Sequence, residues 1–333
     1  MFKDIIKDVY DKLIKTTPRK SIYEAAHWVL NKNISKLGVG FPANCPYKKY
    51  FEIKENFTLD NLTEDRELAK QIYNVFKQTI LKNMCEEERD LYHLCNVYGD
   101  LVNWKYDVDI LRQTSIQNIL INNELIINTK LGKLVFEFAT REKYNIKKDT
   151  LLIFDDNTNN IIIFVNNPTF ITTEEIVDIL RHSGRFIHEL THYIDKVKDH
   201  WDAIKYDIQN DIAYLNNKNE LKANLQMILY NFARYIFKNV EYVKQYYDLR
   251  KKQDISDLFE TFLCDINRNV VDDEDLEMYR KEISYLTNEN KKLFYEELYK
   301  YILNDFDINK PVEESYTVDY LLKMLRLEEN FWK

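Results

Sequence analysis

The chain has 333 residues, of which 45% are hydrophobic and 31% are charged, and its formal net charge is −8. This composition is typical of a globular protein, and the negative charge argues against a general nucleic-acid-binding surface, which needs a basic face to displace counterions. No segment approaches the roughly 20 apolar residues of a membrane span, and the start MFKDIIKDVYDKLIK lacks the apolar core of a signal peptide. We therefore expect a cytoplasmic protein that binds neither nucleic acid nor membrane.

The N-terminal region, residues 1–112, is predicted to be helical. Only 5 Gly and 5 Pro occur in the whole chain, and so few helix breakers favour long helices. Residues 2–32 have the apolar period of two helices separated at Pro18, and the helical period returns from about 63 to 112.

The period changes to that of β-strands between about residues 116 and 166. The runs there are short, rich in β-branched or aromatic residues and separated by turn residues. DDNTNN, residues 155–160, is predicted to connect two strands of a hairpin. We expect a small mixed or antiparallel sheet built from IQNILIN, ELIINT, KLVFEFAT, TLLIFDD and NIIIFVNN.

After Pro168 the sequence is helical to its end. Thr172 and Glu175 have the spacing of a capping box, which we expect to begin the helix that carries RFIHELTHYID, residues 185–195. The fold class predicted is therefore α+β and mostly α-helical, with a mixed core at 113–237 and a helical C-terminal region at 238–333. Further helices are predicted at about 219–237, 239–252, 255–268, 273–285, 288–303 and 315–330.

The segment HELTH, residues 188–192, has the spacing of a zinc site. His188 and His192 are four residues apart, so both imidazoles lie on one face of a helix and can reach one ion. Zinc lowers the pKa of a bound water, and a carboxylate beside the first ligand, here Glu189, can take the proton as the water attacks a carbonyl. A chance match has a probability of about one percent from composition. The pattern predicts His188 and His192 as ligands and Glu189 as the general base.

A catalytic zinc usually keeps three protein ligands. A third histidine in the pattern HExxHxxGxxH is excluded, because Asp195 and Lys198 stand where that pattern needs Gly and His. Glu220 opens a helical segment after 27 intervening residues, which is enough chain to end one helix and begin an antiparallel one. We therefore expect Glu220 to be the third ligand; the alternatives are Asp211, Glu241 and His200.

HELTH followed by a helix bearing Glu resembles the gluzincin branch of the zincin metallopeptidases. The finer pattern, HELTHYID and then YLNNKNELKA, is similar to small phage-encoded metallopeptidases, and the ELKAN run resembles the ImmA/IrrE-type metallopeptidases, which cleave repressors. The specific resemblance covers about residues 173–230. It implies a zincin-like core, zinc bound by His188, His192 and Glu220 with Glu189 as base, a protein or peptide substrate, and a phage-infected cell or a virion as the setting.

Four supporting features have two interpretations each. Asp195 shares the face of the two histidines and either holds a ligand imidazole or pairs on the surface with Lys196 or Lys198. Tyr214 and Tyr230 are candidates for the oxyanion donor, or they are packing residues. NIIIFVNN, residues 160–167, is either an edge strand on which a substrate strand pairs or a buried central strand. Gly184 indicates either close approach of another backbone or a helix start near Ser183.

The sequence thus favours a zinc-dependent metallopeptidase that hydrolyses a peptide bond. One alternative is a zincin-fold protein without useful activity that serves as a virion or assembly component. The other is a metal-free helical interaction protein in which HELTH is a coincidence.

Overall fold

The computed structural model describes residues 62–98, 112–146, 150–198, 214–264 and 273–308. The chain divides into two units after Phe57, and all described residues belong to the second. The predicted boundaries at residues 112 and 237 both fall inside this second unit. The helices predicted at 2–32 and 315–330 lie outside the described residues. Among the described helices, none combines the length and the apolarity that crossing a membrane requires.

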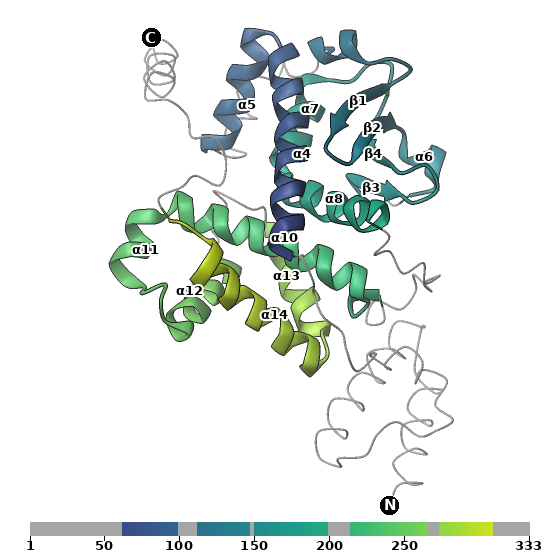
Figure 1. Cartoon of the computed structure of the whole chain (residues 1–333). Helices are drawn as coiled ribbons and strands as arrows, with labels where there is room; N and C mark the ends of the chain where they lie inside the picture. Colours follow the sequence, from purple (N-terminus) through teal and green to yellow (C-terminus); the bar gives the residue numbers. More distant parts are fainter. Residues whose placement is uncertain (1–61, 99–111, 147–149, 199–213, 265–272, 309–333) are drawn as a thin grey trace, which may run out of the picture. The chain divides into compact units, whose positions relative to one another are not determined.

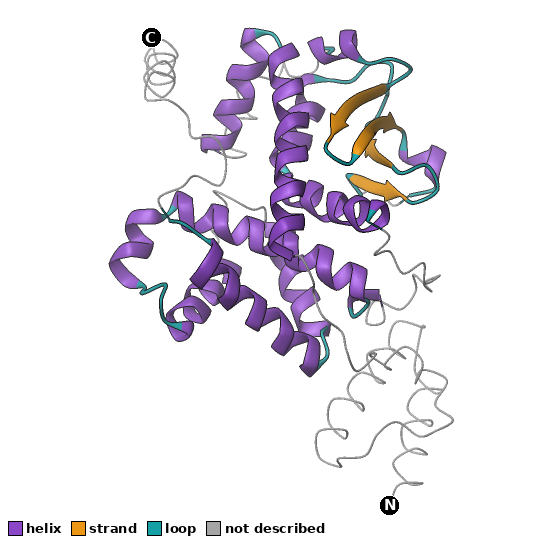
Figure 2. Cartoon of the chain, viewed as in Figure 1, coloured by secondary structure: helices purple, strands orange, loops and turns teal. Residues whose placement is uncertain are grey.

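The described part is mostly helical and contains one small mixed sheet, which agrees with the predicted α+β class (Figures 1 and 2). The helices predicted at about 219–237, 273–285 and 288–303 form, the one predicted at 239–252 ends at Tyr246, and the one predicted at 255–268 begins at Lys252 and runs to the end of the described stretch at Cys264. The helices are α4 Leu62–Asn83, α5 Glu86–Tyr98, α6 Arg141–Tyr144, α7 Thr173–Arg181, α8 Ser183–Val197, α10 Lys218–Lys238, α11 Val240–Tyr246, α12 Lys252–Cys264, α13 Asp273–Tyr285 and α14 Asn288–Lys300, with a 3₁₀ helix η2 at Ser115–Ile119 and a π-helical turn η3 at Tyr301–Asp305.

The sheet has four strands in the order β1-β2-β4-β3. Strand β2 is antiparallel to β1 and parallel to β4, and β4 is antiparallel to β3. The predicted hairpin at residues 155–160 is confirmed, since it joins β3 to β4, with Asn159 in the left-handed region at φ 59°. The strand bounds are β1 Glu124–Thr129, β2 Gly132–Ala139, β3 Leu152–Asp155 and β4 Asn160–Phe164.

Strand β4 is central, so the interpretation of residues 160–167 as an edge strand is wrong and the buried alternative holds. Ile161 and Ile163 face the main hydrophobic core, whereas Ile162 and Phe164 face a second apolar cluster on the other side of the sheet. A strand that is buried on both faces has a continuous apolar run instead of alternation. The edge nearest α8 is β3 instead, which packs on that helix.

The predicted strand at IQNILIN is also wrong. The Thr114 side chain accepts a hydrogen bond from the Ile116 amide and begins the 3₁₀ helix η2. Asn122 and Asn123 then both adopt positive φ, 55° and 64°, which a strand does not allow. The β-branched residues of this run indicate burial but not an extended backbone. Ile116 is indeed fully buried.

The main core lies between the sheet and helices α4, α7 and α8. Phe76 of α4 contacts Phe136 of β2 at a ring distance of 4.4 Å and Phe186 of α8 at 4.9 Å. Helix α8 therefore has the sheet on one side, α4 on another and α10 on a third. This packing fixes the helix that carries HELTH.

The capping box at Thr172 and Glu175 is confirmed, but it begins α7 and not the HELTH helix. The chain bends at His182, with φ −85° and ψ 44°, and α8 begins one residue later at Ser183. The helix therefore starts near Ser183, which was one of the two explanations for Gly184. The other explanation was close approach of another backbone, but the close neighbour is a side chain, since an added Cβ would lie 2.3 Å from Asn231 Nδ2 of α10.

Helix α10 is the central helix of the described part. Every residue from 219 to 236 is buried, and the helix contacts α4, α8, α11, α12 and α14. The Asn217 side chain caps its first turn by accepting from the Asn219 amide.

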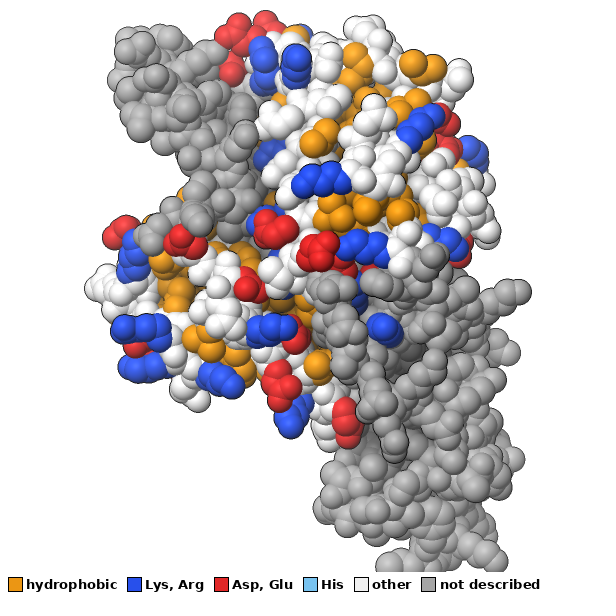
Figure 3. Space-filling model, in the orientation of Figure 1, with side chains coloured by type: hydrophobic (Ala, Val, Ile, Leu, Met, Phe, Trp, Pro, Cys, Tyr) orange, Lys and Arg blue, Asp and Glu red, His pale blue; other side chains and the backbone are white. Residues whose placement is uncertain are grey.

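On the face drawn in Figure 3, acidic and basic side chains of the described residues are interspersed without a continuous patch of one sign.

Candidate metal centre

His188 and His192 bring two imidazole nitrogens together on α8. Their Nε2 atoms are 3.1 Å apart, and the two rings are nearly perpendicular, at 86°. His192 is 4% exposed and His188 is partly buried. As the i, i+4 spacing predicts, the Nε2 atoms of the two imidazole rings converge on one point.

Glu220 reaches the same place from the first turn of α10. Its Oε2 lies 3.4 Å from His188 Nε2, and its Oε1 lies 3.3 Å from His192 Nε2. Donors about 2.0–2.1 Å from a tetrahedral zinc are separated by roughly 3.3–3.4 Å. The two imidazole nitrogens are 3.1 Å apart, and each has a different Glu220 oxygen at 3.3–3.4 Å, so the separations are close to those edges. Glu220, the predicted third ligand, therefore lies beside both histidines.

One buried atom of this cluster supports the fit of a cation. Within the described part of the chain, Glu220 Oε2 is buried and lacks a hydrogen-bond partner. Burial raises the pKa of Glu220, but the neighbouring His192 and His188 outweigh it and hold the pKa well below its ordinary value of 4.5. The carboxylate is therefore ionised at neutral pH, the state in which it can bind a metal.

Glu189 lies beside this triangle. Its Oε1 is 4.0 Å from His188 Nε2, and its Oε2 accepts a hydrogen bond of 2.8 Å from the Phe154 amide of β3. His188, Glu189 and His192 could by themselves offer a metal three donors within 4.8 Å of one another. Glu220 approaches both imidazoles more closely, so it is the better third donor and Glu189 remains free to act as a base.

Burial raises the pKa of Glu189 to about 7, helped by the negative charge of Glu220, although His188 and the Phe154 amide lower it in part. A carboxyl that titrates near neutral pH accepts a proton more readily than an ordinary glutamate does. The two carboxylates of the cluster therefore have different protonation behaviour, one suited to binding a cation and one suited to proton transfer.

The two candidate tyrosines lie in different surroundings. The Tyr214 hydroxyl hydrogen-bonds to Glu220, and burial together with that carboxylate raises the pKa of the phenol well above 10. Tyr230 is 2% exposed within the main hydrophobic core and is absent from the lining of the cavity described below. Tyr214 is thus the tyrosine that the structure brings to the cluster.

Asp195 is buried and pairs with Lys222 of α10. Lys222 Nζ lies 2.5 Å from Asp195 Oδ1 and 2.5 Å from Asp65 Oδ2 of α4, and Lys198 contacts the other oxygen of Asp65 at 2.8 Å. Asp195 is therefore not a surface residue paired with Lys196 or Lys198. Its influence on His192 is electrostatic, through the charge of the nearby carboxylate. This network joins α4, α8 and α10 one turn after the second histidine.

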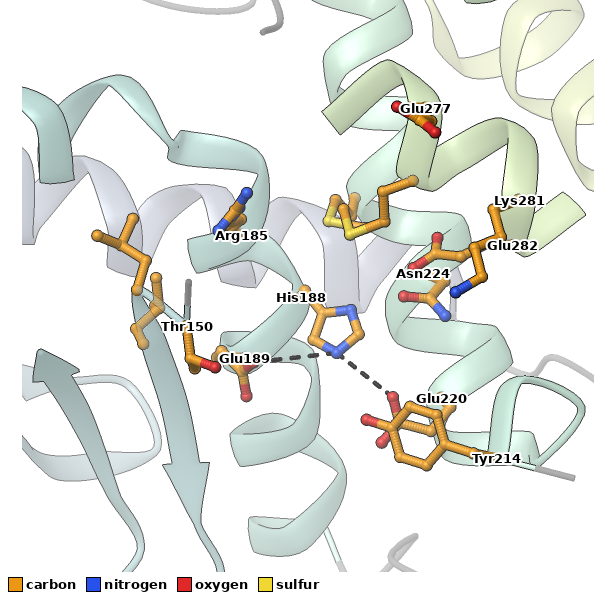
Figure 4. Close-up of a pocket in the computed structure, with 14 residues that line it drawn as sticks. Thr150, Arg185, His188, Glu189, Tyr214, Glu220, Asn224, Glu277, Lys281 and Glu282 are labelled. Carbon is orange, nitrogen blue, oxygen red and sulfur yellow. Dashed lines mark ion pairs between the residues drawn. The ribbon is translucent and has the colours of Figure 1, made fainter. Parts of the chain in front are cut away.

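A cavity of about 510 Å³ opens over the cluster (Figure 4). Helix α8 contributes His188 and Glu189, and α10 contributes Glu220 and Asn224. Residues 150–152, at the start of β3, form one wall, and α13 forms another. The space therefore lies between a sheet edge and a helix, directly beside the candidate metal ligands.

Sequence reasoning missed the α13 wall and Asn224. Glu282 and Met278 of α13 line the cavity although they lie about ninety residues after HELTH, and no local motif marks them. Asn224 follows Glu220 by four residues, so helical spacing alone places both on one face of α10. That spacing was a signal that the sequence did contain.

Of the alternative ligands, Glu241 is exposed on α11, away from the residues that line the cavity. Asp211 and His200 lie outside the described residues. Comparison of the chain with protein-family models, with curated proteins and with solved structures finds no match.

Proposed function

We propose that this protein is a zinc-dependent metallopeptidase of the gluzincin type. The observation that supports it most is the triangle of side chains His188, His192 and Glu220, in which the two imidazole nitrogens are 3.1 Å apart and each has one Glu220 oxygen within 3.4 Å, separations that suit a tetrahedral zinc. The general base and the cavity stand beside that triangle, as hydrolysis of a bound peptide requires.

In this proposal His188, His192 and Glu220 hold the ion, which supplies Lewis acidity and lowers the pKa of a water at the cluster. Glu189 takes the proton of the attacking water and passes it to the leaving amine. Its raised pKa suits this work near neutral pH. The Phe154 amide holds one Glu189 oxygen, so the carboxylate keeps a fixed orientation on the β3 side of the cavity.

Strand β3 is the edge on which a substrate strand would pair. Leu151 O accepts from the Phe164 amide of β4, so the alternation of an antiparallel ladder turns the backbone N–H and C=O of the next residue, Leu152, away from β4. Leu152 lines the cavity. A peptide added along this edge would lie across the cluster, which replaces the role that the sequence gave to residues 160–167.

The metal site is tested first by zinc content, measured by elemental mass spectrometry on purified, chelator-washed and zinc-reloaded protein. We expect one zinc per chain. Glu220→Ala should lower zinc affinity by more than roughly 100-fold, because a direct ligand matters more than the 10–100-fold of an outer partner. Glu241→Ala, the matched control on α11, should leave zinc affinity unchanged. Equal behaviour of the two variants would refute the Glu220 assignment.

Hydrolysis is tested with internally quenched peptide libraries and the zinc-loaded protein. Glu189→Gln should keep the zinc and lose cleavage, because the proton acceptor is gone while the ligands remain. Zinc binding without cleavage by the wild type would favour the structural or assembly alternative. A folded protein that cannot be loaded with zinc would favour the metal-free alternative and refute the proposal.

A further inference from the structure

Glu282 of α13 carries a buried carboxylate oxygen that lacks a partner. Only two carboxylate oxygens in the described part of the chain are both buried and without a hydrogen bond, Glu220 Oε2 and Glu282 Oε2. The first lies between the imidazoles of the candidate metal centre, where a cation would satisfy it. The second lines the same cavity and has no such explanation.

The nearby cations leave Glu282 Oε2 without a hydrogen bond. Arg185 Nη2 lies 2.7 Å from Asp275 Oδ1, and its Nε donates to the same oxygen at 3.1 Å. Lys281 is exposed and stands over the Tyr285 ring at 5.7 Å. Burial raises the pKa of Glu282 to about 8, and the negative charges of Glu220 and Asp275 add to the effect, although the positive charges of Lys281 and Arg185 lower the pKa in part. A bound cation would offset both penalties on the ionised carboxylate.

Asn224 adds a second polar group in the same space. It is 7% exposed and lines the cavity from α10, and its side-chain amide makes no hydrogen bond among the described residues. In Figure 4, Asn224 and Glu282 lie on the same side of His188, the side away from Thr150 and β3. An amide that lines a cavity and has no protein partner can hydrogen-bond to a ligand bound there.

The chemistry of these two groups identifies the ligand class. A carboxylate and an amide oxygen both accept hydrogen bonds, and an ammonium or guanidinium group has only donors. Met227 and Met278 line the same cavity and offer flexible apolar surface to an alkyl chain. A cation at the end of an aliphatic stem fits this combination better than an anion or a purely apolar side chain.

We propose that Glu282 and Asn224 form a subsite that binds a positively charged nitrogen of the substrate, next to the bond to be cleaved. The lysine or arginine side chain fits the apolar walls best, and a free α-amino group offers the same charge. This inference rests on the proposed function, since it names the substrate class of that site. Glu282 is then a specificity-determining residue and not a catalytic one.

The test uses hydroxamates, which bind a zinc ion whether or not the protein hydrolyses peptides. The probes are N-acetyl-lysine hydroxamate, N-acetyl-norleucine hydroxamate and unblocked norleucine hydroxamate, titrated into zinc-loaded protein by calorimetry. We expect a side-chain or an α-ammonium to tighten binding by about 10–100-fold over acetyl-norleucine, the range of a charge-assisted hydrogen bond. The acetyl-lysine arm and the unblocked arm distinguish the two sources of charge.

Glu282→Gln should remove that preference while leaving zinc content and acetyl-norleucine affinity unchanged. Glu277→Gln is the matched control, because Glu277 is an exposed carboxylate on the same helix and lines the same cavity. It should change the preference by no more than about twofold, as expected of a solvent-screened charge. Asn224→Leu should weaken the preference in part, and thermal unfolding checks that each variant is folded.

The outcomes are distinguishable. Zinc-loaded wild type that binds all three hydroxamates alike, or a preference that survives in Glu282→Gln, would overturn the subsite and leave the proposed function standing. Folded protein that takes up no zinc would refute the metal site, and this inference with it.

Discussion

Gly184→Ala is expected to destabilise the protein by about 3 kcal/mol. Alanine in place of glycine gains at most about 1 kcal/mol of helix propensity. Against this, the new Cβ would lie 2.3 Å from Asn231 Nδ2 and 3.0 Å from its Cγ, and such overpacking costs about 1–3 kcal/mol. The Asn231 side chain cannot move without loss, because it donates to the hydroxyl of the fully buried Tyr279 at 2.5 Å. Leaving that hydroxyl unpaired costs about 1–3 kcal/mol more.

The measurement is equilibrium unfolding in urea, at fixed zinc concentration, for the wild type and three variants. In the Asn231→Ala background the clash is absent, so Gly184→Ala should there be neutral or stabilising by up to about 1 kcal/mol. The difference between the two backgrounds isolates the contact between α8 and α10 from the intrinsic preference of the helix. A Gly184→Ala protein as stable as the wild type would refute the reasoning, because the propensity term would then outweigh the packing term.

Three further predictions concern charges near the cluster. Lys222→Met should lower the free energy of unfolding in urea by about 3–5 kcal/mol, because it leaves the carboxylates of Asp65 and Asp195 in the interior without the lysine between them. Adding Asp195→Asn should recover part of that loss. A loss under about 1 kcal/mol would contradict this prediction. Tyr214→Phe should weaken zinc affinity by about 10–100-fold, since its hydroxyl bonds the ligand carboxylate, whereas an unchanged affinity with slower cleavage would assign it to the oxyanion instead. In metal-free protein, Glu189 has a folded pKa of about 7 against an ordinary 4.5, so its favourable contribution to stability is complete below pH 4.5 and is lost as the pH rises to 7. Glu189→Gln should therefore stabilise metal-free protein at pH 8 by about 2 kcal/mol, which is less than the roughly 3 kcal/mol of the full pKa shift because the side chain is 17% exposed. Near pH 4.5 the substitution should have no effect on stability. Equal gains at both pH values would show that ionisation of Glu189 is not the cause.

What the sequence could predict follows from the range of each signal. The spacing of His188 and His192 is local, and a helix converts it directly into two converging imidazoles. Glu220 is more distant, but a helix start with a capping asparagine before it fixes the carboxylate at the end of α10 that faces α8. The class of the fold was equally accessible, because helical and strand periods occupy separate stretches of the chain.

The missed features depend on contacts that no local pattern encodes. Residues 116–122 have strand composition, yet Thr114 begins a 3₁₀ helix at Ser115–Ile119, and Asn122 and Asn123 then form a turn at positive φ. The partner of Asp195 is Lys222, which comes from another helix and is also bound by Asp65. The cavity wall on α13 depends on how α13 packs near α8, for example through the Arg185–Asp275 ion pair across ninety residues. Periodicity shows that a face is buried but not what lies opposite to it.

The two glutamates of the cluster show how one helix pair can supply two chemically different carboxylates. Glu220 is 5% exposed, but two imidazole nitrogens lie within 3.4 Å of its oxygens, and their attraction outweighs the cost of burial. Glu189 is also desolvated, but it has only the Phe154 amide and a more distant His188 nitrogen at 4.0 Å, so burial dominates and its pKa rises to about 7. Exchanging the two roles would require Glu189 to lie as close to both imidazoles as Glu220 does. Glu189 precedes His192 by three residues, and one of its oxygens lies within 4.8 Å of a ring nitrogen of each histidine, so the hydrogen bond from the Phe154 amide, and not the HExxH spacing, holds this carboxylate toward β3.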